Sequence, residues 1–499
     1  MGVWIVRVIK TIIMLIAVMT IAIVVLFAVG PVSNFWVMLN GVLGLGVESP
    51  SEIAVEQRLT VPEGFSIGQY AIGLKKIRFM ALTQAGDLLV SQPREGKVLL
   101  LKRDDNGDGR HDGIVVLLDG LTRPHGLDFD REYLYVAESN AVGRVPFDHD
   151  KGALSGVYQV IIQDLPDGGN HWTKSIRIKD DQLYLSIGST CNVCEEEDDR
   201  RATIMRFDLD GSRAKVFASG LRNSVGLDFA PWDGGFYATD NGRDLLGDDY
   251  PVCELNHIVE DGFYGWPYIN GFGDLDPDLG EGEGELLAQA RSPVFGFRAH
   301  NAPLGMRFIR KAVMPAGYER SALVALHGSW NRREPDGYKV VSLHWQEDGN
   351  ITARDFMSGF NVNGNIIGRP VDVAEGPDGC VYVSDDYSGT IYRACYGVVQ
   401  NKLTDASAVT QDDSYWHSLS VAEQQALERQ GAVLYKDQGC SDCHLLNGDG
   451  NQNGKPLLNL AQRYSHQSLA DYLLAPNPPM PPFLLSERQR LSLAAYSLK

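Results

Sequence analysis

Short runs of apolar residues alternate with turns along most of the chain, from about Val61 to Tyr396. The turns are rich in Gly, Asp and Pro, and long stretches of helical periodicity are almost absent. Short apolar runs bounded by such turns are typical of β-strands. The pattern therefore predicts that the middle of the chain, residues 61–396, is an all-β domain.

One phrase recurs six times within this region. It joins one apolar strand to a second by a turn, as in Leu127-Asp128-Phe129 followed by Tyr133-Leu134-Tyr135. The six copies begin near Phe79, Pro124, Ser175, Val225, Leu304 and Val371. A strand unit repeated at intervals of roughly 45 to 80 residues predicts a six-bladed β-propeller, in which each blade is a four-stranded sheet beside a central channel.

The residues before the first strand of each blade collect at one mouth of a propeller channel. Here they are mostly basic or polar, namely Arg78, Arg123, His125, His171, Lys174, Arg222, Asn223, His300, Asn301 and Arg369. Each of them alone is equally well explained as a blade-to-blade contact or a turn residue. Because six blades bring the same chemistry to one mouth, we expect a binding site for a polyanionic ligand there.

A second motif lies in the first blade. Oxygen-bearing side chains occupy its first, third, fifth and ninth positions, as Asp104, Asn106, Asp108 and Asp112, and Gly109 follows the fifth. This spacing resembles the start of a calcium-binding loop, although the closing glutamate of an EF-hand is missing. A second calcium site and an ordinary Asp/Gly turn are therefore both open.

The C-terminal part of the chain carries the motif Cys440-Ser441-Asp442-Cys443-His444. Two thiols three positions apart, followed directly by a histidine, are what covalent haem attachment requires. Cys440 and Cys443 would form thioethers to the haem, and His444 would ligate the iron. A redox CxxC or half of a zinc site is the alternative, but no second Cys/His pair follows at zinc spacing.

The segments around this motif resemble a small class I cytochrome c. A polar stretch, residues 397–414, is expected to be a linker, and helical periodicity follows within residues 415–499, which we predict to be an all-α domain. Met480 is the only methionine after the motif and is the predicted second ligand of the haem iron. Two alternatives are that Met480 fills the haem crevice without ligation and that His466 ligates instead.

The N-terminus is predicted to be a membrane anchor, residues 1–35, followed by a linker, residues 36–60. Arg7 and Lys10 precede an apolar run from Thr11 to about Val29, close to the about 20 residues needed to cross a bilayer. Positive charge before the run, with Glu48 and Glu52 after it, places the catalytic domains on the periplasmic side of the cell inner membrane. A cleaved signal peptide is the rival interpretation.

Charge and cysteine content narrow the picture further. The chain has 499 residues, a formal net charge of −19 and a pI near 5.0, which argues against nucleic acid as a partner. Of its seven cysteines, two belong to the haem motif. In an oxidising compartment, Cys191 with Cys194 and Cys380 with Cys395 are plausible disulfides, and Cys253 is left over.

Several motifs in residues 61–396 together resemble the soluble sugar dehydrogenases that depend on pyrroloquinoline quinone (PQQ), especially the branch with sorbosone dehydrogenase. The resemblance is carried by Asn170-His171-Trp172-Thr173-Lys174, Gly220 to Leu227, Asn241-Gly242-Arg243, Phe263 to Pro267, His327 to Arg332 and Gly368-Arg369-Pro370. Soluble glucose dehydrogenases have a glutamine where this chain has Asn241. That difference puts glucose itself in doubt as the substrate.

The resemblance implies roles for individual residues. His171 is similar to the general base that takes a hydroxyl proton while hydride passes to the quinone, with a structural histidine as the alternative. The side chains that would hold PQQ are Lys174, Arg222, Asn223, Asn241, Arg332 and Arg369. Backbone carbonyls of Gly242 and Arg243 are similar to those that hold a calcium ion against the quinone.

The predicted function joins these parts. A sugar or a related aldehyde or alcohol is oxidised at the channel mouth with PQQ and calcium, and electrons leave through haem c to a respiratory acceptor, either a membrane quinone oxidase or a soluble cytochrome. The alternatives are a calcium-dependent, lactonase-like propeller hydrolase and a ligand-binding propeller with a haem electron-transfer module. Both alternatives leave the basic residues at the mouth unexplained.

Overall fold

A computed structural model describes residues 46–281, 284–310, 313–377, 379–397, 413–446, 449–450, 455–457, 460, 464–473 and 485–499. The chain separates into two compact units, Met1–Val399 and Gln400–Lys499. The predicted anchor and Met480 lie outside the described residues. None of the helices within the described ranges is long and apolar enough to cross a membrane.

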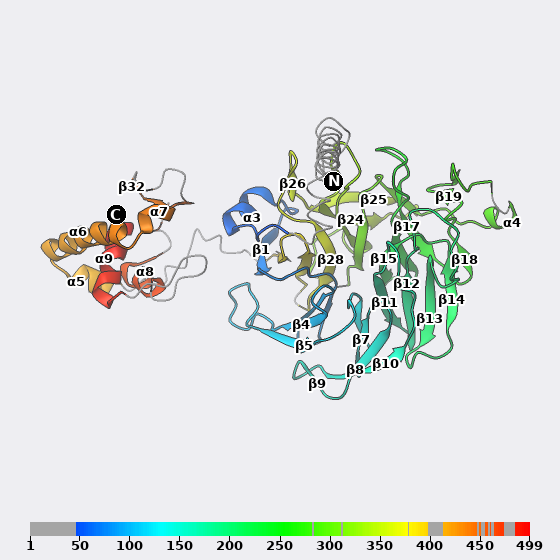
Figure 1. Ribbon diagram of the computed structural model, residues 1–499, viewed down its shortest axis with the longest axis horizontal. Coiled ribbons are helices and arrows are strands. Elements are labelled where there is room, and N and C mark those ends of the chain that lie inside the picture. Colours follow the sequence, from blue (N-terminus) through cyan, green and yellow to red (C-terminus); the bar gives the residue numbers. More distant parts are fainter. Residues whose placement is uncertain are drawn as a thin grey trace, which may run out of the picture. The chain divides into compact units, whose positions relative to one another are not determined.

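The first unit is a six-bladed β-propeller, as the repeats predict (Figure 1). The blades follow one another in chain order, and each begins with the strand beside the axis. From the axis outward, the first blade consists of β2 (Met80–Leu82), β3 (Leu88–Gln92), β4 (Lys97–Leu101) and β5 (Ile114–Leu118), and the second of β6 (Leu127–Phe129), β7 (Tyr133–Ala137), β8 (Val142–Asp148) and β10 (Gln159–Ile162). The third blade consists of β11 (Lys174–Lys179), β12 (Gln182–Ile187), β13 (Thr203–Asp208) and β14 (Lys215–Ser219), and the fourth of β15 (Ser224–Phe229), β16 (Phe236–Asp240), β17 (Cys253–Ile258) and β21 (Phe295–Phe297). The fifth blade consists of β22 (Pro303–Phe308), β23 (Ser321–Leu326), β24 (Lys339–Trp345) and β25 (Ile351–Met357), and the sixth of β28 (Pro370–Glu375), β29 (Val381–Asp385), β30 (Thr390–Tyr396) and β1 (Phe65–Ala71).

Short elements decorate this ring. They are α3 (Glu52–Arg58), β9 (Ala153–Leu154), β18 (Gly262–Phe263), β19 (Ile269–Asn270), β20 (Asp274–Leu275), α4 (Gly284–Leu287), β26 (Asn361–Val362) and β27 (Asn365–Ile366). Of these, β18 pairs in parallel with β14, and β19 pairs with β20 in a small hairpin inserted between β17 and β21 of the fourth blade.

The ring is closed by a strand from the start of the propeller. β1 pairs antiparallel with β30, so that Phe65 lies opposite Tyr396, and it forms the outer strand of the sixth blade. A disulfide between Cys380 and Cys395 joins this blade internally, as one of the two predicted pairings. Closure in this way covers the edge of β30 and ties the two ends of the propeller together.

Apolar side chains fill the space between neighbouring blades. One buried cluster joins Leu88 of the first blade to Tyr382 of the sixth, and another joins Leu255 of the fourth to Val324 of the fifth. Similar clusters lie at the other four blade interfaces. Because strands here are covered on both faces, they are mostly apolar in sequence, which is why the repeats could be recognised.

Charged side chains alternate around the channel. The first strands of blades two to six carry Asp128, Arg177, Asp228, Arg307 and Asp372 in chain order. Each of these carboxylates also accepts a hydrogen bond from an amide of the next blade's first strand: Asp128 from Ile178 at 2.8 Å, Asp228 from Phe308 at 2.8 Å and Asp372 from Met80 at 2.9 Å. Carboxylates that are buried (Asp228, Asp372) or partly buried (Asp128) therefore connect the blades in pairs along the axis.

The second unit is mainly helical. Its elements are α5 (Ser414–Ser418), α6 (Val421–Asp437), α7 (Cys440–Cys443), α8 (His466–Tyr472) and α9 (Glu487–Ser497), with the short strands β31 (His444–Leu446), β32 (Asp449–Gly450) and β33 (Lys455–Pro456). The prediction of an all-α domain is wrong in this detail. The extended segment after the haem motif pairs with two others, and the amide of Leu457 donates to the carbonyl of Leu445 at 2.8 Å.

The two long helices of this unit start and cross as their sequences require. Ser420 with Glu423 and Ser486 with Gln489 form capping boxes at the first turns of α6 and α9. At Gly431, a Cβ atom would clash with the backbone oxygen of Ser492. Only glycine therefore permits this close approach of α6 and α9.

We predict that the channel carboxylates stabilise the propeller. Asp228 is buried, and Arg310 donates to both of its oxygens at 2.8 and 2.9 Å. Replacing it, as Asp228→Ala, leaves buried positive charge without its partner and should lower the free energy of unfolding by about 3–5 kcal/mol.

The measurement is chemical unfolding followed by tryptophan fluorescence. A matched control is Asp355→Ala, because Asp355 is 54% exposed and pairs with Lys339 at 2.7 Å on the outer strands. Loss of that surface ion pair should cost less than about 1 kcal/mol. Equal losses in the two variants would contradict the proposed role of the channel carboxylates.

Candidate functional site

His171 lies before β11, at the mouth of the channel. Its Nδ1 is 3.0 Å from the carbonyl oxygen of Ser189 and 2.9 Å from the Ser189 hydroxyl, which itself donates to the carbonyl of Cys191. A carbonyl can only accept, so Nδ1 carries the proton and the lone pair is on Nε2. Burial lowers the pKa of His171 to about 3, and the charge of Arg222 adds to this shift. The imidazole is therefore neutral at ordinary pH.

Arg222 precedes β15 in the next blade, and its guanidinium is only 4% exposed. It donates to the carbonyl of Asn192 at 2.9 Å, to the carbonyl of Asn241 at 3.1 Å and to a carboxylate oxygen of Asp244 at 3.1 Å. These contacts, with one from Nη2 to the side chain of Asn192, use four of the five N–H groups of the guanidinium, which makes it a rigid positive centre. It links three segments of the mouth.

Asp240, at the end of β16, holds the backbone beneath this centre. Its carboxylate accepts from the amides of Arg222 at 2.9 Å, Asn223 at 2.6 Å and Asn241 at 3.1 Å. Burial raises the pKa of Asp240 and that of Glu254, its cross-strand partner. The negative charge of one carboxylate therefore disfavours ionisation of the other.

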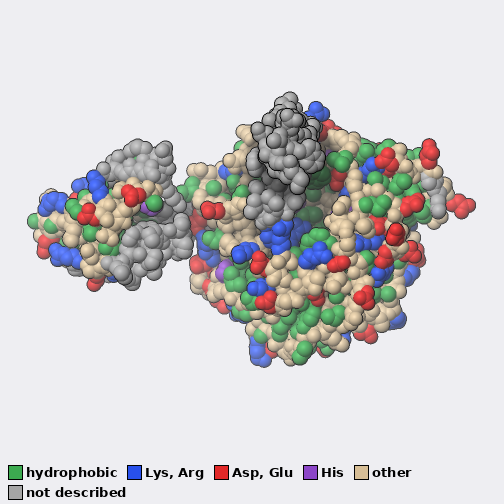
Figure 2. Space-filling view, in the orientation of Figure 1, with side chains coloured by type: hydrophobic (Ala, Val, Ile, Leu, Met, Phe, Trp, Pro, Cys, Tyr) green, Lys and Arg blue, Asp and Glu red, His purple; other side chains and the backbone are tan. Residues whose placement is uncertain are grey.

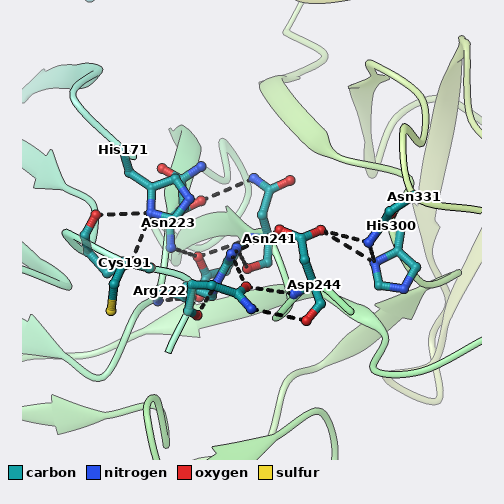
Figure 3. A network of polar contacts seen from close by, with 11 residues as sticks. His171, Cys191, Arg222, Asn223, Asn241, Asp244, His300 and Asn331 are labelled. Atoms are coloured by element: carbon teal, nitrogen blue, oxygen red, sulfur yellow. Dashed lines mark hydrogen bonds and ion pairs between the residues drawn. The ribbon is translucent and has the colours of Figure 1, made fainter. Parts of the chain in front are cut away.

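Asp244 stands at the centre of the contacts drawn in Figure 3. Besides Arg222, it accepts a hydrogen bond from Asn331 at 3.0 Å, and His300 lies 3.7 Å from the same oxygen. Burial alone would raise the pKa of Asp244, but His300 and Arg222 together hold it below its usual value. A carboxylate is thus kept charged beside the predicted cofactor site.

The predicted calcium-binding segment, Gly242 and Arg243, adjoins Asp244. A Cβ atom at Gly242 would lie 2.6 Å from the carbonyl oxygen of Val252, so the backbone is tightly packed there. The side chain of Arg243 turns away and binds the carboxylate of Asp276 in the hairpin segment at 2.6 Å. This segment can therefore bind a cation only through its backbone carbonyls, and the negative charge of Asp244 favours a cation there.

The other predicted cofactor residues make separate contacts. Lys174 is fully buried, donates to the carbonyl of Trp172 at 3.1 Å, and has its pKa lowered to about 7, chiefly by burial. Arg369 donates to the carbonyl of Gly328 at 2.8 Å. Arg332 binds Asp249 at 2.9 Å and so holds the loop after Asp244. His171, Arg222, Asn223 and Asn241 therefore belong to one network of contacts. Lys174, Arg332 and Arg369 lie outside it.

The mouth has the chemistry that a polycarboxylate such as PQQ requires. Figure 2 shows Lys and Arg side chains gathered near the middle of the propeller face that it presents. Arg78 Nε, His125 Nε2 and Asn223 Oδ1 belong to mouth residues and are buried without a hydrogen-bond partner. Other unpartnered buried atoms occur elsewhere among the described residues, but these three can bind a ligand because they lie at the mouth. Cationic and amide donors fit carboxylate and quinone oxygens.

Sequence reasoning missed four residues of this network: Ser189, Asn192, Asp244 and Asn331. Two of them carried a usable signal, because Asp244 directly follows the Asn241-Gly242-Arg243 motif and Asn331 lies inside the His327 to Arg332 motif. Asn192 lies between Cys191 and Cys194, which form the second predicted disulfide. Nothing in the sequence pattern connects it to Arg222.

The second calcium motif stays a prediction. Asp104 accepts from the amides of Gly107 and Gly109 at 2.8 and 2.9 Å and pairs with Arg393 at 2.9 Å. Across the described ranges, Cys191, Cys194 and Glu196 are the one group of three or more His, Cys, Asp or Glu residues whose ligand atoms all lie within 4.8 Å of one another. The carboxylates of the Asp104–Asp112 loop do not form such a group.

The haem motif begins with the single helical turn α7. Cys440 is half-buried against the apolar core of this unit, Cys443 is exposed, and the hydroxyl of Tyr435 donates to the carbonyl of His444 at 3.1 Å. Neither cysteine of the motif is in a disulfide. Both thiols and the histidine are thus presented from one short segment, which fits covalent haem attachment.

His466, the rival axial ligand, is already engaged. Its Nδ1 lies 2.8 Å from a carboxylate oxygen of Asp413, and its ring stacks on Trp416 with centroids 3.8 Å apart. These contacts hold the ring between two other side chains. A metal-bound histidine commonly donates its other ring nitrogen to a carboxylate, so these contacts do not decide between His466 and Met480, which lies outside the described residues.

Comparisons with known proteins place these observations in a family. Residues 59–256 and 285–395 match the family described as TrAA12-like, and residues 429–497 match cytochrome c. An uncharacterised protein of Borreliella burgdorferi is 29% identical over 360 residues, which cover 68% of this chain and 92% of that protein. A PQQ-dependent pyranose dehydrogenase of Coprinopsis cinerea is 25% identical over 419 residues, which cover 69% of this chain and 56% of that enzyme.

Two solved structures share the propeller fold. The holo form of the PQQ domain of the Coprinopsis cinerea pyranose dehydrogenase has a TM-score of 0.58 at 22% identity, covering 70% of this chain and 98% of that one. A calcium structure of a Trichoderma reesei enzyme of carbohydrate-active family AA12 has a TM-score of 0.60 at 20% identity, covering 70% and 99%. The resemblance predicted from the motifs is confirmed. The family match spans more than half of the 499 residues of this chain, and the C-terminal unit matches cytochrome c. The chain therefore belongs to the TrAA12-like family and carries a C-terminal cytochrome c domain.

Proposed function

We propose that the protein is a PQQ-dependent dehydrogenase that oxidises a sugar, or a related aldehyde or alcohol, and passes the electrons through its own haem c. Family membership and the similarity to a pyranose dehydrogenase support an oxidoreductase of this kind. The observation that carries the proposal is the pairing of a neutral His171 with the buried cationic centre at Arg222. His171 can accept a proton, and Arg222 attracts an anion beside it.

His171 would act as the base. Its Nδ1–H is fixed on the carbonyl of Ser189, so Nε2 has the lone pair that accepts the hydroxyl proton of the substrate. PQQ, when bound, supplies the acceptor for the hydride. Arg222, with Asn223 and Asn241 beside it, would hold the carboxylates and oxygens of the cofactor, and Lys174 and Arg369 would add positive charge at the mouth.

A calcium ion is proposed at the backbone carbonyls of Gly242 and Arg243. The calcium structure of the Trichoderma reesei protein supports such an ion in this fold, and the charged carboxylate of Asp244 adjoins the segment. A cation there would polarise a quinone oxygen. The Asp104–Asp112 loop is proposed as a second, separate calcium site.

The haem is proposed as the outlet for electrons. Cys440 and Cys443 would attach it, with His444 and Met480 as axial ligands, and a respiratory acceptor would receive the electrons. We propose that the N-terminal apolar run anchors the protein in the inner membrane, with both domains in the periplasm. Disulfides at Cys191–Cys194 and Cys380–Cys395 support an oxidising compartment.

The proposal is tested by following haem reduction. Wild-type protein given PQQ and calcium should show sugar-dependent reduction of its haem in a screen of aldoses. His171→Ala should lower that rate by about 10²–10⁴-fold, because the base is lost, while dithionite still reduces the haem fully.

The control for this experiment is His257→Ala, which removes an exposed histidine on β17 and should keep the wild-type rate. Haem reduction that needs neither PQQ nor calcium would refute the proposal. So would the absence of reduction with every sugar tested.

The neutral state of His171 has a measurable effect on stability. With a folded pKa of about 3 and an unfolded pKa near 6.5, only the unfolded state takes up this proton as the pH falls below about 6.5. Acid should therefore destabilise the wild type. Between about pH 7.5 and pH 5, its free energy of unfolding should drop by up to about 2 kcal/mol more than that of His171→Gln. Parallel losses in urea titrations of the two proteins would show that His171 is not held neutral.

The axial ligand is tested by two substitutions. Met480→Ala should lower the reduction potential of the haem on the order of 100 mV, within the range of about 0.8 V that axial ligands set. With Met480 as the ligand, His466→Ala should leave the potential nearly unchanged, because it removes only the contacts with Asp413 and Trp416. Spectroelectrochemical titration measures both, and a reversed result would make His466 the ligand.

A further inference from the structure

The loop Cys191-Asn192-Val193-Cys194 lies after β12, beside the candidate site. A disulfide closes it into a small ring, with the two Cα atoms 6.2 Å apart. All four of its residues are half-buried. The ring is therefore in contact with the protein on one side and reachable by solvent on the other.

Asn192, inside this ring, binds Arg222 with two acceptors. Its carbonyl oxygen accepts from Arg222 Nε at 2.9 Å, and its Oδ1 accepts from Arg222 Nη2 at 2.8 Å. These two nitrogens form one edge of the guanidinium, so the contact fixes the plane of the fork as well as its position. The opposite edge is left to face Asn241.

Asn192 also holds the backbone of Asp244. Its Oδ1 accepts from the Asp244 amide at 2.8 Å, and its Nδ2 donates to the Asp244 carbonyl at 3.1 Å. Asp244 is the residue that follows the proposed calcium-binding segment. A single amide side chain thus couples the cationic centre at Arg222 to the segment that would hold the metal.

The ring is linked to His171 through Ser189. The carbonyl of Cys191 accepts from the Ser189 hydroxyl at 2.8 Å, and that hydroxyl oxygen lies 2.9 Å from His171 Nδ1. The hydroxyl proton is directed to Cys191, so the oxygen offers its lone pair to Nδ1–H. This arrangement supports the tautomer of His171 in which Nε2 can accept a proton.

We propose that the Cys191–Cys194 ring is a positioning loop that sets the affinity for PQQ by fixing Asn192 against Arg222, an inference that rests on the proposed function. A four-residue ring has few conformations, so Asn192 is ordered before the cofactor binds. The guanidinium then meets the cofactor already oriented. Without the disulfide, part of the binding free energy would be spent on ordering the loop.

The test measures PQQ affinity and not turnover. PQQ is titrated with calcium into the full-length cofactor-free protein, and binding is followed by calorimetry. The double variant Cys191→Ser with Cys194→Ser frees the loop that orients Asn192, and Asn192→Ala removes the side-chain oxygen that accepts from Arg222 Nη2. Each should raise the dissociation constant by about tenfold or more.

The other disulfide is the matched control. Cys380→Ser with Cys395→Ser removes a disulfide in the sixth blade, and it should lower the midpoint of thermal unfolding while the dissociation constant of PQQ stays at the wild-type value. If both double variants weaken PQQ binding equally, the effect is general loss of stability and the positioning role is wrong.

A second comparison isolates the route through Arg222. If Asn192 acts by orienting this guanidinium, then adding Asn192→Ala to Arg222→Lys should weaken PQQ binding no further than Arg222→Lys alone. If the two substitutions raise the dissociation constant of PQQ by factors that multiply in the double variant, the inference is wrong. Wild-type affinity in Asn192→Ala would also overturn it while leaving the proposed function intact, whereas a wild-type protein that binds no PQQ would overturn both.

Discussion

The pairing of β1 with β30 is the contact on which the rest of the propeller depends. Each blade is joined to its neighbours by an apolar cluster, and at alternate interfaces a channel carboxylate adds a hydrogen bond between first strands. The contacts between the first and sixth blades exist only if the ring is closed. At the mouth, residues far apart in the chain meet: Asn192 contacts Asp244 across 52 positions, and Asn331 contacts Asp244 across 87 positions.

Burial decides the chemical state of the groups at the mouth. It lowers the pKa of His171 to about 3 and that of Lys174 to about 7, and it raises the pKa of Asp240. Arg222 does not become neutral on burial, because a guanidinium keeps its proton in proteins. Its charge is instead compensated by the acceptors around it. The result is one permanent positive centre beside a histidine that is held neutral. Those two states are the ones that a cofactor clamp and a general base need.

The sequence predicted what is local and periodic. Strand and turn patterns repeat within each blade, so the six blades were predictable, and the haem motif is contained in five consecutive residues. The strand that completes the sixth blade was not predictable, because β1 lies far from β30 in the chain and has no repeat phrase of its own. The direction of one side chain was also missed: Arg332 was predicted to hold the cofactor, but it binds Asp249. Such choices depend on how insertions pack against the ring.

The distribution of charge bears on the kind of substrate. The chain has a net charge of −19, so its long-range field lowers the local concentration of anions. A polyanionic cofactor can still bind, because short contacts with buried Arg222 in a low-dielectric mouth outweigh a field that salt screens over about 10 Å. The neutral side chains of His171 and Asn331 belong to the same network as this centre (Figure 3), and groups of that kind exchange hydrogen bonds with hydroxyl groups.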